Sequence, residues 1–108
     1  MQIKVKDWNI EEMTGYKPIS TFYSDFSLAE PFGVDAIKET YERAFNEWKT
    51  NYKYLTELVM SLNWKIAEHY ETDKEKALVY DELWRKADEY AVNNLTGEEL
   101  KYFYNTTD

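Results

Sequence analysis

The chain has 108 residues, which fits one domain spanning 1–108, and it contains no cysteine. The missing cysteine excludes a disulfide framework, a thiolate zinc site and a cysteine nucleophile. The formal net charge of −8 disfavours binding to free nucleic acid or to an anionic membrane, because both need clustered lysine and arginine. Only three glycines and two prolines are present, so we expect a small, mainly α-helical domain rather than a sandwich or barrel.

Residues 1–33 are predicted to form an irregular, aromatic-rich N-terminal arm. Pro18 disfavours helix at the residue before it, and the β-branched and aromatic run at 19–23 could pair with residues 2–6 as a small hairpin. The rings of the arm are too many to leave exposed, so we expect them to pack on the helices. They belong to Trp8, Tyr16, Phe22, Tyr23, Phe26 and Phe32.

Residues 34–108 are predicted to form the helical core. One apolar series steps by three and four residues, as a helical stripe does: Ile37, Tyr41, Ala44, Trp48, Tyr52, Leu55, Val59, Leu62 and Ile66. The series keeps its phase across Thr50 and Asn51, which favours one long central helix over 35–71. Two helices broken near residues 49–53 are the alternative, because Thr, Asn and Tyr in succession are poor helix formers.

Two further helices follow the central one. A capping-box pattern at 72–75 begins a helix over about 73–93, which the short link makes antiparallel to the preceding helix. Its stripe consists of Ala77, Tyr80, Leu83, Trp84, Ala87, Tyr90 and Ala91. A second capping-box pattern at 96–99 begins a short C-terminal helix through Leu100 and Phe103.

No pattern in the chain predicts catalysis or a cofactor. His69 is the only histidine; Asp73 could share its face, but zinc sites usually need three or four ligands. Adjacent carboxylates on a helix point about 100° apart, so pairs such as Asp88 and Glu89 do not face each other as an acid and a base would. We therefore expect no catalytic residue, no cofactor and no metal site.

The acidic excess suggests an interaction surface near the C-terminus. Its candidate residues are Asp81, Asp88, Glu89, Glu98 and Glu99, joined by two aromatic residues outside the stripe, Trp64 and Tyr102. Tyr and Trp are enriched at protein interfaces. The bland alternatives are that the charge only keeps the protein soluble and that the rings fill an aromatic core. Opposite charges at i,i+4, such as Asp81 and Arg85, are typical of a solvated helix face.

Three stretches resemble the small uncharacterised proteins carried on mobile elements of Firmicutes, such as integrative conjugative elements and phages. They are residues 21–27, residues 54–60 and the segment 81–90 with its Asp-Glu-Leu-Trp and Ala-Asp-Glu-Tyr sequences. The resemblance carries no functional residues. It implies an accessory protein that binds and modulates other proteins, host defence enzymes included.

We therefore expect a non-enzymatic, cytoplasmic accessory protein that binds another protein through an acidic and aromatic surface. The partner would be basic or nucleic-acid-binding, and neither direct nucleic-acid binding nor a membrane is expected. One alternative is a DNA mimic that inhibits a nucleic-acid-binding defence enzyme of the anti-restriction or anti-CRISPR class. Another is a homo-oligomeric structural protein, most simply a homodimer.

Overall fold

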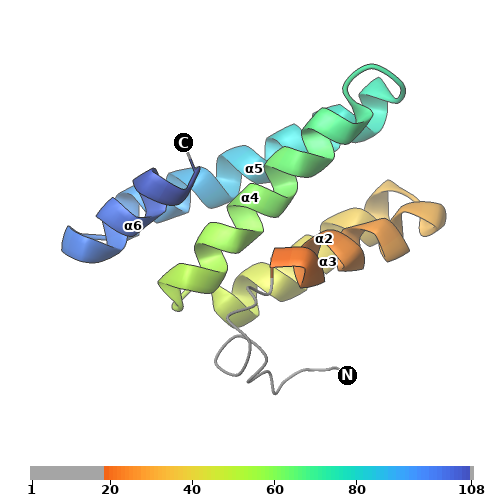
Figure 1. Cartoon of the computed structure of the whole chain (residues 1–108). Coiled ribbons are helices and arrows are strands. Elements are labelled where there is room, and N and C mark those ends of the chain that lie inside the picture. The colour runs from red at the N-terminus through yellow and green to blue at the C-terminus, as the bar shows by residue number, and fades with distance from the viewer. Residues whose placement is uncertain (1–18, 108) are drawn as a thin grey trace.

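The computed structural model describes residues 19–107, and these confirm a mainly α-helical fold (Figure 1). The elements in chain order are α2 (Ile19–Ala29), the 3₁₀ helix η1 (Glu30–Phe32), α3 (Val34–Trp48), α4 (Tyr52–His69), α5 (Lys74–Asn94) and α6 (Gly97–Thr107). The helix predicted over 73–93 and the short C-terminal helix are both confirmed, the former as α5 and the latter as α6.

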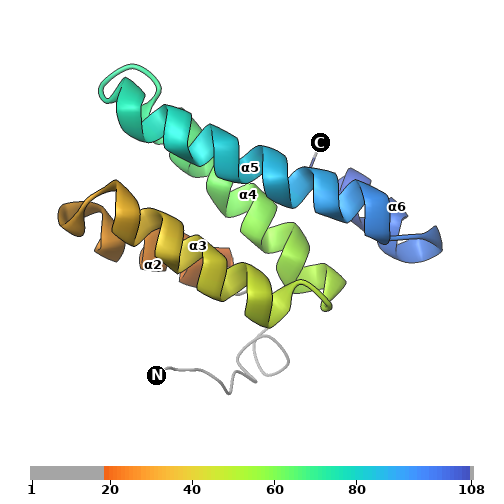
Figure 2. The same cartoon turned by 180° about the vertical axis from the view of Figure 1, so that it is seen from behind.

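Helix α4 lies at the centre of the fold. It contacts α2, α3, α5 and α6, and it runs antiparallel to α5 as predicted (Figures 1 and 2). Helices α2 and α3 form a second hairpin, which packs against the α4–α5 hairpin. Helix α6 folds back and packs mainly against α4. The fold is therefore two helical hairpins with a C-terminal helix, and α4 contacts each of the other described α-helices.

The long central helix favoured by the sequence is wrong, because the chain breaks into α3 and α4 at residues 49–51. Asn51 has an extended backbone (φ −106°, ψ 105°), and its side chain accepts hydrogen bonds from the backbone N–H of Lys53 and Tyr54 at 3.1 and 3.2 Å. This is an N-cap, which begins a new helix. The break lets α3 pack against α4, so Ile37 and Leu55 enter one core instead of lying along one extended stripe.

The irregular arm is wrong for residues 19–32, which are helical, and so is the hairpin expected at 19–23; residues 1–18 lie outside the described part. Phe22, Phe26 and Ala29 are all buried, and their spacing of four and three residues gives α2 one apolar face. Burial of this face outweighs the β propensity of the run. Phe32, which was expected to pack on the helices, is 81% exposed.

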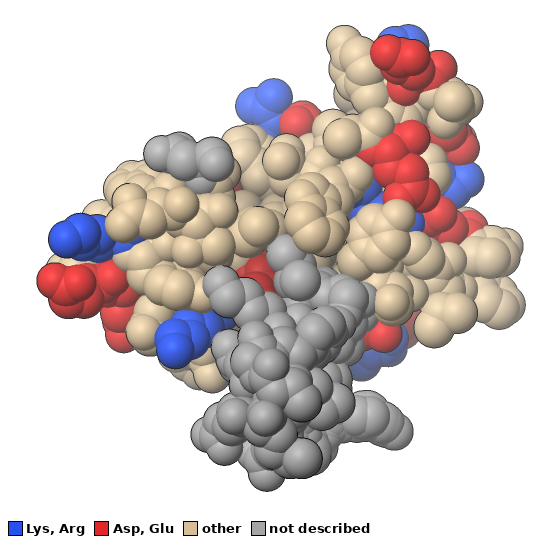
Figure 3. Space-filling model, in the orientation of Figure 1, with Lys and Arg blue, Asp and Glu red and all other residues tan. Residues whose placement is uncertain are grey.

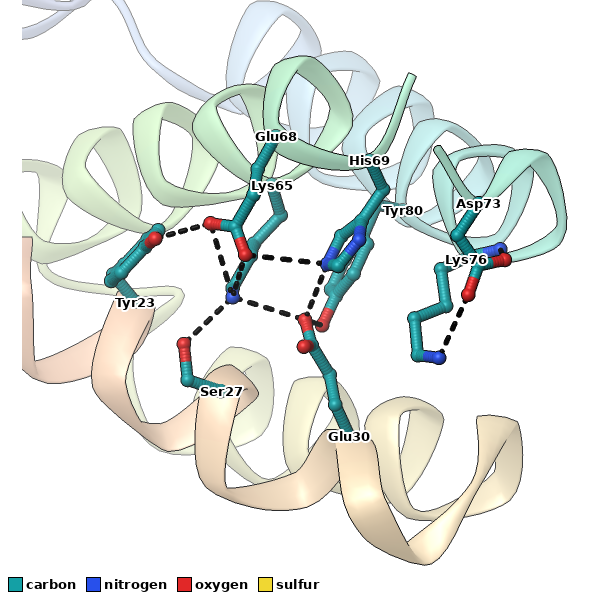
Figure 4. Close-up of polar contacts among 9 residues, drawn as sticks. All are labelled: Tyr23, Ser27, Glu30, Lys65, Glu68, His69, Asp73, Lys76 and Tyr80. Atoms are coloured by element: carbon teal, nitrogen blue, oxygen red, sulfur yellow. Dashed lines mark hydrogen bonds and ion pairs between the residues drawn. The ribbon is translucent and has the colours of Figure 1, made fainter. Parts of the chain in front are cut away.

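The turn between η1 and α3 sets the position of Glu30. Gly33 has φ 105°, a conformation that side chains other than glycine rarely adopt. Its N–H donates to the Glu30 carbonyl at 3.1 Å, and its own carbonyl accepts from the N–H groups of Ala36 and Ile37. The chain therefore reverses directly after Glu30 and leaves its side chain facing α4 and α5 (Figure 4).

Candidate functional site

The first polar site surrounds Lys65, a residue of α4 whose side chain is fully buried. Its Nζ donates to Ser27 Oγ at 2.7 Å, lies 3.0 Å from Glu30 Oε2 and 3.4 Å from Glu68 Oε2, and sits 4.3 Å from the ring centre of Tyr23 (Figure 4). Burying a charge is tolerated only when it is paired and hydrogen-bonded. The ammonium group here meets both conditions, through residues of α2, η1 and α4.

Glu30 is the second centre of this cluster. Its Oε2 accepts hydrogen bonds from the Tyr80 hydroxyl at 2.6 Å and from His69 Nε2 at 2.9 Å, besides its ion pair with Lys65. Burial by itself would raise the pKa of the Glu30 carboxyl, but the bonds from Tyr80, Lys65 and His69 outweigh it and lower that pKa below its usual value. Glu30 is therefore held as a carboxylate.

Two tyrosines complete the cluster. Tyr23 donates its hydroxyl to Glu68, and this bond together with burial raises the Tyr23 pKa. Tyr80 is fully buried against Phe26. Burial is the main cause that raises the pKa of the Tyr80 hydroxyl, and its hydrogen bond to Glu30 is the second. Both hydroxyls therefore stay protonated and act as donors to the carboxylates.

The cluster includes a group with metal-ligand chemistry. Glu30, Glu68 and His69 offer three ligand atoms within 4.8 Å of one another, a set that could hold a metal ion. The Lys65 ammonium, however, already lies against both carboxylates and supplies the positive charge that a metal would bring. We therefore interpret the cluster as structural: its ion pairs and hydrogen bonds hold η1 against the α4–α5 hairpin.

Sequence reasoning missed most of this cluster, although one signal was available. Lys65 follows Leu58 and Leu62 at helical spacing, so it falls on the buried stripe of α4, where a lysine needs a partner. His69 was considered with Asp73, but Asp73 caps α5 and bonds to Lys76. Glu30, the actual partner of His69, lies 39 residues away in sequence, and no local pattern joins them.

The second site is a pocket of about 380 Å³ where α4, α5 and α6 meet. Its lining residues are Val59, Met60, Asn63, Trp64, Trp84, Asp88, Phe103, Tyr104, Thr106 and Thr107. Trp64 and Tyr104 are 46% and 45% exposed, so two aromatic side chains at this pocket are half in contact with solvent. Exposed aromatic surface around a hollow is typical of a binding site.

Among residues 19–107, Asp88 is the only carboxylate that lines this pocket. It lies one helical turn after Trp84 on α5, half-buried, and within residues 19–107 its side chain forms no hydrogen bond and no ion pair. Burial raises the pKa of the Asp88 carboxyl, which means that its charge is poorly solvated where it stands. The pocket thus combines aromatic surface with an uncompensated negative charge.

The structure brings together two of the seven residues predicted to interact, Trp64 and Asp88. The other five lie apart. Asp81 pairs with Arg85 at 2.8 Å, and Glu89 lines a different hollow between α3 and α5. Glu98 and Glu99 are exposed in the first turn of α6, and Tyr102 packs edge-on against Tyr52 with ring centres 5.3 Å apart.

The described acidic side chains do not form one continuous edge on the face seen in Figure 3. They lie in separate groups, mostly toward the two sides of the view, and a broad area without charged side chains covers much of α4 and α6. Of the i,i+4 pairs on α5, Asp81–Arg85 forms an ion pair, whereas Glu82–Lys86 and Arg85–Glu89 do not. The charged face is therefore less ordered than the sequence pattern predicts.

Comparisons with known proteins give no relative. No protein-family model matches this chain. No curated protein and no solved structure matches it either. Within residues 19–107, none of the helices is both long and apolar enough to cross a membrane.

Proposed function

We propose that this chain is a non-enzymatic accessory protein that binds another protein through the α4–α5–α6 pocket. The observation that carries the proposal is the pocket itself, where half-exposed Trp64 and Tyr104 lie beside a carboxylate that has no partner among residues 19–107. Aromatic side chains supply most of the binding energy at protein interfaces, because they bury a large area with little loss of conformational freedom.

The polar groups of the described residues also favour binding over catalysis. The Lys65 cluster is internally satisfied, and its ammonium is fully buried, so a substrate atom has no path to it. In the pocket, the described lining residues place no second carboxylate and no histidine beside Asp88. General acid–base catalysis needs two titratable groups with separated pKa values near one reacting atom.

Charge limits the kind of partner. The net charge of −8 opposes nucleic acid and anionic lipid, and it favours a protein with a basic surface. A nucleic-acid-binding enzyme would present such a surface, which keeps a defence enzyme among the candidate partners. On the face seen in Figure 3 the acidic side chains lie in separate groups, so we place the contact at the pocket rather than along a phosphate-like row of carboxylates.

The experiment that tests this proposal compares variants in affinity capture from native cells, followed by titration of the captured protein. Trp64→Ala should abolish capture and weaken binding of the purified partner by about 30-fold, the value for an interface residue worth about 2 kcal/mol. Because Trp64 also packs against Tyr23 with ring centres 6.3 Å apart, Tyr104→Ala serves as a second pocket variant.

The matched control is Tyr70→Ala, an exposed aromatic residue at the end of α4 and outside this pocket, which should bind like the wild type. If no captured protein depends on Trp64 and Tyr104, the proposal is wrong. Light scattering separates the alternative of self-association, because a dimer that dissociates in both pocket variants would make a second copy the partner.

A further inference from the structure

The α4–α5–α6 pocket also defines the chemistry of the group that enters it. Its carboxylate has no cation within the described residues: Arg85, one turn before Glu89, is paired with Asp81, and Lys65 is enclosed by Glu30 and Glu68. The described residues therefore supply no positive charge to this carboxylate. We propose that the pocket receives an arginine side chain of the partner protein, an inference that rests on the proposed function.

The arrangement of the lining residues favours arginine over other cations. Trp84 and Asp88 are separated by one turn of α5, so the indole and the carboxylate face the same side of the helix. A guanidinium group is planar, can donate two parallel hydrogen bonds to one carboxylate, and stacks on an indole face. Trp is also the ring that attracts cations most strongly.

The apolar part of the pocket suits the stem of the same side chain. Val59 and Phe103 are buried at its base, and Met60 is half-buried beside them. Long basic side chains pack their methylene groups on such surfaces while the charged head reaches a polar group. A volume of about 380 Å³ lies at the small end of ligand pockets, which span about 300–1,000 Å³, so it fits one long side chain.

The Lys65 cluster contains a carboxylate, Glu30, whose ion-pair and hydrogen-bond partners come from this chain. Glu30 receives a cation and two hydroxyl or ring N–H donors from the chain itself. Within residues 19–107, Asp88 has neither a cation nor a hydrogen-bond donor beside it, and burial raises the pKa of its carboxyl. An arginine from the partner would form an ion pair with Asp88, as Lys65 does with Glu30. The half-exposed rings of Trp64 and Tyr104 would exclude water from that pair.

The test follows the indole N–H signals of Trp64 and Trp84 by NMR while N-acetyl-arginine methylamide is added to the full-length chain. Trp48, which packs against Tyr54 away from the pocket, is the internal control. We expect saturable shifts of the two pocket indoles with a Kd of roughly millimolar size, as befits one isolated side chain. The citrulline analogue, which keeps the shape and lacks the charge, should bind at least tenfold more weakly.

The variant Asp88→Asn should weaken arginine binding by at least tenfold, whereas Glu89→Gln, the adjacent carboxylate outside the pocket, should leave it unchanged. Unchanged spectra elsewhere in the chain would confirm that Asp88→Asn folds normally. The inference is overturned if the pocket indoles do not shift up to the solubility limit of the probe, if citrulline binds equally well, or if the lysine analogue binds as tightly as arginine.

Failure of this inference can be distinguished from failure of the proposed function. Partner binding that depends on Trp64 and Tyr104 but not on Asp88 would keep the protein-binding role and exclude the arginine. Partner binding that depends on none of the three residues would exclude both.

Discussion

Glu30 and Asp88 are both carboxylates at the α4–α5 hairpin, and the fold treats them in opposite ways. Glu30 accepts bonds from Tyr80 and His69 and pairs with Lys65, so its pKa falls. Asp88 has no partner within residues 19–107, and burial alone raises its pKa. The same chemical group therefore has its partners within the fold in one region and none among the described residues in the other.

The cause of the difference is what covers each part of the hairpin. The C-terminal part of α4, from Lys65 to His69, is covered by α2 and η1, which bring Ser27 and Glu30 as polar partners (Figure 4). The pocket is covered by α6, which contributes Phe103, Tyr104 and two threonines but no cation. Removing one partner of a buried ion pair destabilises a fold, whereas an unpaired titratable group with a perturbed pKa in a pocket is a candidate functional group.

The largest expected effect comes from breaking the satisfied region with Lys65→Met. Methionine keeps an unbranched apolar stem of similar volume but removes the ammonium, which leaves Glu30 and Glu68 without the Lys65 cation. Removing one partner of a buried pair typically costs about 3–5 kcal/mol, and Glu68 is partly exposed, so we expect a loss of about 3 kcal/mol. Urea unfolding followed by circular dichroism measures it.

Arg85→Met is the control for Lys65→Met. It removes a cation from the Asp81 pair at the surface, where Arg85 is mostly exposed, and it should leave the unfolding midpoint unchanged. Equal effects from the two variants would mean that the buried cluster stabilises the fold no more than a surface pair does.

A smaller effect in the same region is expected for Tyr80→Phe. The substitution keeps the buried ring against Phe26 and removes only the hydroxyl that donates to Glu30. Hydrogen bonds to charged groups contribute about 1.5–3 kcal/mol, so we expect a loss of about 2 kcal/mol in unfolding free energy. Tyr90→Phe is the matched control, because the Tyr90 ring packs on Phe45 while its hydroxyl has no bond within the described residues. An unaffected Tyr80→Phe variant would contradict the role given to Glu30.

The sequence predicted what depends on local spacing. Helix α5 was expected over 73–93 and spans 74–94, because Ala77, Tyr80 and Leu83 repeat at helical intervals beside a capping residue. The break after α3 was kept only as the alternative to one long helix, since the apolar stripe stays in phase across it. The hydrogen bonds that Asn51 accepts from the next turn separate the two helices. Helix α2 was missed because its β-branched and aromatic residues favour a strand locally, and only burial of Phe22 and Phe26 in the core outweighs that propensity.

The two sites also differ in how far the sequence predicts them. Asp88 and Trp64 were named from acidity and aromatic content, which are properties of each residue alone, and the structure places them in one pocket. The Lys65 cluster depends on Ser27 and Glu30, which lie 38 and 35 residues before Lys65 and reach it only through the turn at Gly33. Contacts at that separation are set by packing between hairpins, which periodicity does not encode.

The smallest expected effect, and the sharpest contrast, comes from Asp88→Asn. A pKa raised by folding means that the ionised carboxylate destabilises the fold, so stability from this group is greatest when it is protonated and falls as pH rises through the folded pKa. We expect Asp88→Asn to be as stable as the wild type or slightly more stable at neutral pH, with the difference vanishing at a second, acidic pH where the Asp88 carboxyl is protonated in both the folded and the unfolded state. Glu30, whose pKa is lowered, has the opposite sign: its stabilising contribution is present above its unfolded pKa and is lost as pH falls. Thermal unfolding of both proteins at the two pH values, with Glu89→Gln as the exposed control, measures the contrast. A clear loss of stability in Asp88→Asn at neutral pH would mean that the fold itself uses this carboxylate, as it uses Glu30, and the pocket would then hold no charge reserved for a partner.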